Sequence, residues 1–117
     1  MEDQQQAEGN PVAETDMFSV YARISAQPGQ RDTVIELINE AVRTGGETSG
    51  LISYSINAPL DEPDALWVTQ LWIDKAAHDT TTHSEPVKAV SQRMVSLLAA
   101  PPTGSYGLAV HTQGYSR

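Results

Sequence analysis

Apolar residues recur at every second position in four segments of the chain, which is the pattern of buried or half-buried strands. These segments are residues 17–25, 51–58, 66–73 and 105–112. The third, LWVTQLWI, is largely apolar on both faces, as is typical of a central strand that is covered on two sides. One of its faces carries Leu66, Val68, Gln70 and Trp72, and the other carries Trp67, Thr69, Leu71 and Ile73.

Two other segments follow the 3.6-residue period of an amphipathic helix. The apolar stripe of the first consists of Val34, Leu37, Ile38, Ala41 and Val42, and that of the second consists of Val87, Val90, Ser91, Met94, Leu97 and Leu98. Gly45 and Gly46 should end the first helix, because glycine adopts the left-handed C-cap conformation at little cost. Ser84 should cap the second helix, with Pro86 in its first turn.

A short helix is expected directly after the central strand. Asp74 is a suitable N-cap, and Lys75, Ala76 and Ala77 would form the first turn before His78. The threonine run 80–82 has poor helix propensity, so we expect it to break this helix.

The resulting order is β-α-β-β-α-β, which predicts a ferredoxin-like α+β fold with an antiparallel sheet and helices on one face. The uncovered face would then be too apolar to remain in water. Its expected members are Trp67, Leu71 and Ile73, extended by Met17, Tyr21 and Tyr54. Packing this face on a second copy would bury it, so we predict a two-fold homodimer through the sheet.

Composition narrows the chemistry that is available. The chain has no cysteine, which removes disulfides, thiolate metal sites and cysteine nucleophiles. Its formal net charge of −8 and the lack of a basic patch argue against a nucleic-acid partner. Dinucleotide, P-loop and serine-hydrolase motifs are missing, and the three histidines lack metal-ligand spacing. We therefore expect neither a cofactor nor a metal.

The sequence divides into one domain and two tails. The polar, acidic stretch 1–16 is expected to be a disordered tail, the domain covers residues 17–112, and residues 113–117 form a C-terminal tail. The N-terminal stretch has no apolar run that resembles a signal peptide or a membrane segment. We accordingly expect a cytoplasmic protein without a membrane partner.

One short stretch carries a family resemblance. Residues 71–79, LWIDKAAHD, resemble the tryptophan-to-histidine stretch of the antibiotic biosynthesis monooxygenase family. The resemblance covers roughly residues 18–111 and implies a small dimeric α+β barrel, many examples of which oxidise phenolic or quinol substrates without a cofactor. The family usually has a glutamate two residues before this tryptophan, whereas this chain has Gln70.

The candidate site lies where the central strand meets the short helix. Trp72 could stack on a flat aromatic ligand, and Gln70, one pleat away on the same face, is a polar group that needs a partner. His78 is the candidate base, because a neutral imidazole can accept a phenol proton. The resemblance also places a substrate-pocket residue at His78, and it makes Asn57 a second polar group, since relatives often have a histidine there.

Three functions remain open on sequence grounds. The first is a cofactor-independent monooxygenase that uses dioxygen to oxidise a phenolic or quinol aromatic of the polyketide type. The second, favoured by Gln70 in place of a carboxylate, is a non-oxidative ligand-binding or cyclase-like protein on the same scaffold. The third is haem binding or degradation, which some relatives of this fold carry out.

Overall fold

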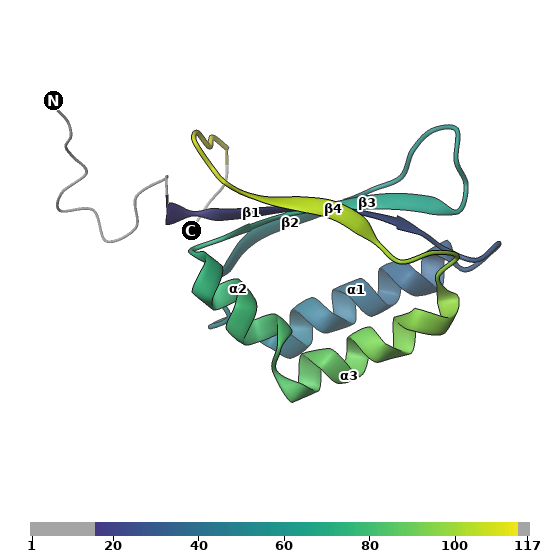
Figure 1. Cartoon of the computed structure of the whole chain (residues 1–117), viewed down its shortest axis with the longest axis horizontal. Helices are drawn as coiled ribbons and strands as arrows, with labels where there is room; N and C mark the ends of the chain where they lie inside the picture. The colour runs from purple at the N-terminus through teal and green to yellow at the C-terminus, as the bar shows by residue number, and fades with distance from the viewer. Residues whose placement is uncertain (1–15, 115–117) are drawn as a thin grey trace, which may run out of the picture.

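The structure, a computed structural model, describes residues 16–114 (Figure 1). Its strands are β1 Phe18–Ser25, β2 Leu51–Asn57, β3 Ala65–Trp72 and β4 Thr103–Leu108. Its helices are α1 Arg31–Gly45, α2 Lys75–Thr82 and α3 Glu85–Met94, and a 3-10 turn Val95–Leu97 follows α3. The strands form one sheet in the order β2-β3-β1-β4, and every neighbouring pair is antiparallel.

All three helices lie against the same face of this sheet (Figure 1). This arrangement confirms the predicted ferredoxin-like α+β fold, with β3 as an inner strand. The core between sheet and helices is centred on Val34 of α1 and Leu66 of β3, both completely buried. Leu66, Val68 and Trp72 are buried on the helix side, which confirms the predicted faces of the central strand.

The prediction that the threonine run breaks the short helix is wrong. Helix α2 continues through Thr82. The hydroxyl of Thr82 donates to the carbonyl oxygen of His78 at 2.9 Å, and this bond to the preceding turn satisfies the side chain within the helix. The predicted N-cap is confirmed, since the carboxylate of Asp74 accepts from the backbone N–H of Ala77 at 2.8 Å.

The predicted bounds of the last strand are also wrong. Strand β4 runs from Thr103, which pairs with Arg23, to Leu108, which pairs with Phe18, the first residue of β1. Gly104 permits the close pairing, since a Cβ atom there would lie 2.9 Å from Cα of Ala22. Beyond Leu108 the backbone N–H of Ala109 still donates to the carbonyl oxygen of Met17 at 2.9 Å, but residues 109–114 form no further strand.

The sheet face away from the helices differs from the prediction at three residues. Met17 is buried, with 1% of its surface exposed. Tyr54 points to the helix side, where its hydroxyl donates to Oδ1 of Asn39 at 2.7 Å. Ile73 follows the end of β3 and packs near Gly50. The outer face therefore retains Tyr21, Trp67 and Leu71 from the predicted patch.

Two predicted segments lie largely outside the described residues. Of the acidic stretch 1–16 the structure describes only Asp16, and of the C-terminal tail it describes residues 113 and 114. None of the helices within residues 16–114 is long and apolar enough to cross a membrane.

Candidate functional site

The turn from β3 into α2 sets the position of the site. Because Asp74 caps α2, only Ile73 and Asp74 separate the end of β3 at Trp72 from the first residue of the helix. Gly50, at the start of β2, allows α2 to pack closely: its φ is +93°, and a Cβ atom there would lie 2.7 Å from Cβ of Ala77. The end of β3, the start of β2 and helix α2 therefore meet in one place.

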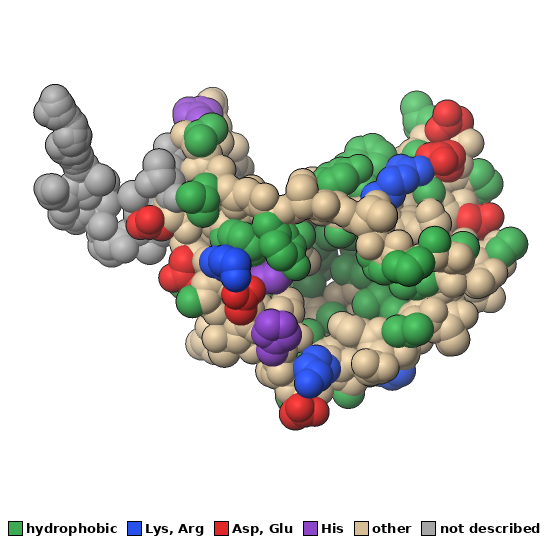
Figure 2. Space-filling model, viewed as in Figure 1, with side chains coloured by type: hydrophobic (Ala, Val, Ile, Leu, Met, Phe, Trp, Pro, Cys, Tyr) green, Lys and Arg blue, Asp and Glu red, His purple; other side chains and the backbone are tan. Residues whose placement is uncertain are grey.

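A cavity of about 200 Å³ lies next to this junction, between the sheet and the helices. Figure 2 shows the surface hollowed between strand β4 and the helices α2 and α3. The cavity is walled by β1, β2 and β3 on the sheet side and by all three helices on the other. Most of the wall is aliphatic, and none of the lining residues is ionisable.

Gln70 and Trp72 both line this cavity and are joined to each other. The indole Nε1 of Trp72 donates to Oε1 of Gln70 at 2.9 Å. An indole nitrogen can only donate, so this bond fixes which end of the Gln70 amide is oxygen. The amide NH₂ of Gln70 is then the other end, and it has no protein partner among residues 16–114. The pair therefore presents a hydrogen-bond donor that is free to meet a ligand.

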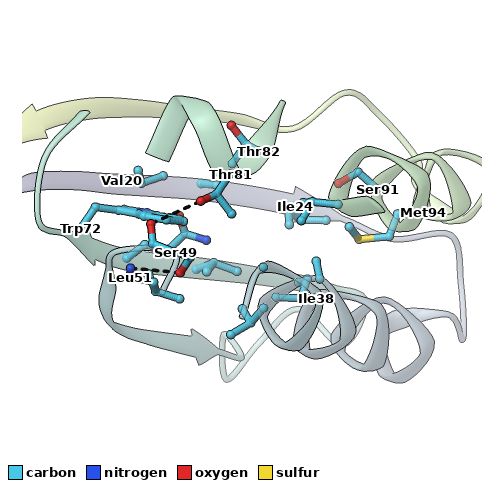
Figure 3. A pocket seen from close by; sticks show the side chains of 17 residues that line it. Val20, Ile24, Ile38, Ser49, Leu51, Trp72, Thr81, Thr82, Ser91 and Met94 are labelled. Carbon is cyan, nitrogen blue, oxygen red and sulfur yellow. Dashed lines mark hydrogen bonds between the residues drawn. The ribbon is translucent and has the colours of Figure 1, made fainter. Parts of the chain in front are cut away.

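The polar lining residues gather at one end of the cavity (Figure 3). Near Trp72 lie Ser49 and Thr81, whose hydroxyl donates to the carbonyl oxygen of Ser49 at 3.3 Å. The far end is formed by Ile24, Ile38 and Met94. Ser91, beside Met94, is the polar exception and is exposed to solvent. The cavity thus has a polar end and an apolar end.

His78 lies behind this wall and is not among the lining residues. It is buried, with 7% of its surface exposed, and its ring packs between three aromatic side chains. The Trp72 indole meets it edge-on, with ring centroids 5.3 Å apart and planes at 88°. Phe18 and Tyr106 contact the same imidazole at centroid distances of 5.0 and 5.3 Å. His78 therefore reaches the cavity only through its neighbours.

A carboxylate holds the other side of the His78 ring. Nδ1 of His78 lies 2.9 Å from Oδ1 of Asp79, and Oδ2 of Asp79 accepts from Nζ of Lys75 at 2.6 Å. The hydrogen bond from Lys75, followed by the one from His78, lowers the pKa of Asp79 below its ordinary value. This arrangement fixes the orientation of the imidazole.

The structure does not bring Asn57 to this site. Asn57 pairs with Trp67 on the outer face of the sheet, where its Nδ2 donates to Oγ of Ser55 at 3.2 Å and to the Trp67 carbonyl at 3.3 Å. Of the four predicted site residues, Gln70 and Trp72 share the cavity wall, His78 supports it, and Asn57 lies on the opposite side of the sheet.

The model of the antibiotic biosynthesis monooxygenase family matches residues 17–93. The chain belongs to this family. No curated protein sequence matches it significantly.

Solved structures agree with the fold of the family. A Chloroflexus aurantiacus protein, provisionally described as an antibiotic biosynthesis monooxygenase, is 25% identical in sequence with a TM-score of 0.72. The match covers 86% of this chain and 99% of the Chloroflexus chain. SnoaB from Streptomyces nogalater is a cofactor-independent oxygenase, and its solved structure is that of a point mutant. It is 11% identical in sequence, with a TM-score of 0.73, and the match covers 83% of this chain and 96% of SnoaB. A Caulobacter crescentus protein, also provisionally described as an antibiotic biosynthesis monooxygenase, is 19% identical in sequence with a TM-score of 0.74. The match covers 83% of this chain and 92% of the Caulobacter chain.

Some residues of the site were missed by sequence reasoning. Ser49, just before β2, and Thr81, in the run expected to end α2, both line the polar end of the cavity. A continuous α2 would have placed Thr81 one turn from Ala77, on the side that faces Gly50, but the poor helix propensity of the threonine run hid this. Within residues 16–114 no cluster of three or more histidine or carboxylate side chains could hold a metal ion.

Proposed function

We propose that this member of the antibiotic biosynthesis monooxygenase family is a cofactor-independent monooxygenase that oxidises a phenolic or quinol aromatic with dioxygen. The observation that carries the proposal is the cavity itself, which is mostly aliphatic and ends in an indole and a free amide donor. Such a site suits a flat aromatic that bears oxygen at one end. The family membership and the fold shared with SnoaB support the same reaction class.

The reaction balances without an external reductant. For a quinol such as 1,4-naphthalenediol, loss of a proton gives an electron-rich anion whose ring carbon forms a bond with dioxygen. Breaking the O–O bond of the resulting hydroperoxide leaves one oxygen atom on the ring and releases the other as water. Overall, C10H8O2 and O2 give the hydroxyquinone C10H6O3 and H2O. The four electrons that reduce dioxygen come from the substrate alone.

In this reaction Gln70 and Trp72 act on the substrate oxygen and ring. The NH₂ of Gln70 donates to the oxygen on which negative charge develops, and Trp72 keeps the amide turned so that it donates rather than accepts. A neutral donor suits an anion better than a carboxylate would, because a like charge at this position would repel the anion. Glutamine at residue 70 thereby fits the chemistry of an anionic intermediate.

His78 takes a different part from the one its sequence position indicates. Its ring does not line the cavity and lies edge-on against Trp72. We place it as a positioning residue that holds the indole, with Asp79 fixing its orientation in turn. Because no lining residue is ionisable, the substrate proton passes to solvent water at the open side of the cavity beneath β4 (Figure 2).

A second copy of the chain would cover the outer face of the sheet. Tyr21, Trp67 and Leu71 lie there among small polar residues, and Tyr21 is 42% exposed. None of the four strands contains an aspartate or glutamate, although the chain carries a net charge of −8. Two copies can therefore approach across this face without strand carboxylates facing each other. We propose a homodimer formed through it.

Dioxygen consumption with 1,4-naphthalenediol tests the proposed activity. The protein should raise the rate of uptake above the spontaneous oxidation of the quinol, and Gln70→Leu should remove most of the increase while the fold is retained. A wild-type rate no higher than that of the blank would favour the non-oxidative binding function instead. The haem alternative gains no support from this cavity, whose lining contains no histidine and whose volume is little more than benzene requires.

A further inference from the structure

Ser49 lines the polar end of the cavity, close to Trp72 (Figure 3). We infer that its hydroxyl is a second hydrogen-bond donor to the substrate oxygen, so that Ser49 and Gln70 together form a binding site for an oxyanion. This inference rests on the proposed function, since it assigns a further residue to the same reaction. Several hydrogen bonds hold Ser49 in place and leave one donor of its side chain unused.

The backbone of Ser49 is fixed by contacts with three elements. Its N–H donates to the carbonyl oxygen of Gly46, just after α1, at 3.3 Å, and its carbonyl oxygen accepts from the hydroxyl of Thr81 in α2 at 3.3 Å. The carbonyl oxygen of the next residue, Gly50, accepts at 2.9 Å from the N–H of Ile73, directly after β3. Ser49 is therefore held in position before a ligand binds, as a donor to a developing charge should be.

The side chain of Ser49 uses its oxygen within the protein but not its hydrogen. A hydroxyl has one hydrogen to donate and two lone pairs that accept. The Oγ of Ser49 accepts from the backbone N–H of Leu51 at 3.2 Å, and no protein group within residues 16–114 accepts its hydrogen. Gln70 shows the same division, because its oxygen accepts from Trp72 and its NH₂ has no protein partner in that part of the chain. Each of the two side chains therefore offers a donor to the cavity that both of them line.

The neighbouring threonine hydroxyls already donate within the protein. Thr81 donates to the carbonyl oxygen of Ser49, and Thr82 donates to that of His78 at 2.9 Å. None of the lining side chains is ionisable, so no carboxylate in the lining repels an anion. Hydrogen bonds to a charged acceptor are about twice as strong as those between neutral groups. The two donors should therefore stabilise a phenolate oxygen more than the oxygen of the neutral phenol.

Pentafluorophenol tests this site without turnover, because at pH 8 it is a phenolate and has no second strong hydrogen-bonding group. Hexafluorobenzene is the matched ligand that lacks the oxygen. In calorimetry, wild-type protein should bind the phenolate, and Ser49→Ala should weaken this binding about tenfold, the effect of one lost hydrogen bond. The affinity for hexafluorobenzene should change less than twofold. An equal loss for both ligands, or no binding of the phenolate by the wild type, would overturn the inference.

Ser91→Ala makes the same change at the other end of the cavity and should alter the phenolate affinity less than twofold. A loss at Ser91 as large as that at Ser49 would contradict the assigned position of the oxygen. If the thermal midpoint shows that Ser49→Ala is unfolded, Ser49→Cys keeps nearly the same volume, replaces the hydroxyl by a weak donor and should also weaken the phenolate. Unchanged phenolate affinity in a folded Ser49 variant would refute the second donor.

Oxygen uptake with 1,4-naphthalenediol separates a failure of this site from a failure of the proposed function. Weaker phenolate binding in Ser49→Ala, without any oxygenation by the wild type, would support the oxyanion site and refute the oxygenase. Oxygenation by the wild type, together with unchanged phenolate binding in Ser49→Ala, would do the reverse.

Discussion

The indole Nε1 of Trp72 donates to the amide oxygen of Gln70 at 2.9 Å, and this one bond decides the polarity of the cavity. Without it, the amide could turn either its oxygen or its NH₂ toward a ligand. With it, the oxygen is held toward Trp72, and the NH₂ is the end that has no protein partner among residues 16–114. The two residues that the alternation of β3 places on one face thus act as a unit, in which Trp72 orients the group that meets the substrate.

The Gln70→Glu variant tests whether this donor matters. A carboxylate would still accept from Trp72, but it would place negative charge where the substrate anion forms. We expect kcat to fall about 100-fold, the size of effect seen when an oxyanion donor is lost, with an unchanged thermal midpoint. Steady-state oxygen uptake measures this. A variant as active as the wild type would show that residue 70 does not face the developing charge.

His78→Phe separates a positioning role from a catalytic base. Phenylalanine keeps an aromatic ring between Phe18, Trp72 and Tyr106 but cannot accept a proton. We expect kcat to fall less than about tenfold and the dependence of kcat on pH to keep its shape. Loss of activity together with a changed pH profile would identify His78 as the base.

Asp79 makes the stability of the protein sensitive to acid. Its hydrogen bonds with Lys75 and His78 lower its pKa below the ordinary value of 3.8. The unfolded chain therefore binds a proton at higher pH than the folded chain does. The stabilisation is present above about pH 4 and is lost as the pH falls through the lowered pKa of the folded state.

The thermal midpoint, followed from pH 6 to pH 2, checks this sign. The midpoint of Asp79→Asn should fall less on acidification than that of the wild type. Glu47→Gln serves as the control, because Glu47 is exposed and forms no ion pair with another described residue. Identical acid profiles for Asp79→Asn and the wild type would contradict the lowered pKa.

Gly50 and Gly29 provide a matched pair for the packing of α2 on β2. Both have positive φ, +93° and +81°, but a Cβ atom at Gly29 meets nothing within 4 Å, whereas at Gly50 it would overlap Ala77. Gly29→Ala should cost about 1 kcal/mol of unfolding free energy, from backbone strain alone. Gly50→Ala should cost about 2–4 kcal/mol, because overpacking is added. Urea unfolding measures both, and equal losses would mean that α2 does not press on Gly50.

The proposed dimer depends on Trp67. Trp67→Glu places a charge on the outer face of the sheet and should yield a monomer, as measured by light scattering at micromolar concentration. Leu60→Glu adds the same charge at a fully exposed loop residue and should leave the assembly unchanged. A wild-type chain that is itself monomeric would refute the dimer.

The sequence predicts the fold well because the periodicities are strong. The two-sided apolar pattern of β3 and the stripe that includes Val34 and Ile38 specify an inner strand and a core helix, and both are buried as expected. Local propensity fails where a tertiary or side-chain contact overrides it. Thr81 of the threonine run donates its hydroxyl to the carbonyl oxygen of Ser49, just before β2, and a propensity scale does not include this contact.

The site is predicted only in part, for a related reason. Alternation places Gln70 and Trp72 on one face, and the structure brings them together at the cavity. Alternation cannot tell which neighbouring side chains stand between a residue and a cavity, so it does not show that Trp72 lies between His78 and the cavity. The side of the sheet on which Asn57 lies depends on its pairing with Trp67, which is a contact between strands.

The fate of labelled dioxygen tests the central claim most directly. After reaction of 1,4-naphthalenediol under 18O2, mass spectrometry distinguishes 2-hydroxy-1,4-naphthoquinone from the 1,4-naphthoquinone that forms by simple dehydrogenation. A cofactor-independent monooxygenase should yield the hydroxyquinone with one 18O atom, in an amount that depends on the protein and falls in Gln70→Leu. Unlabelled product, or 1,4-naphthoquinone alone at the rate of the blank, would contradict the proposed oxygenase.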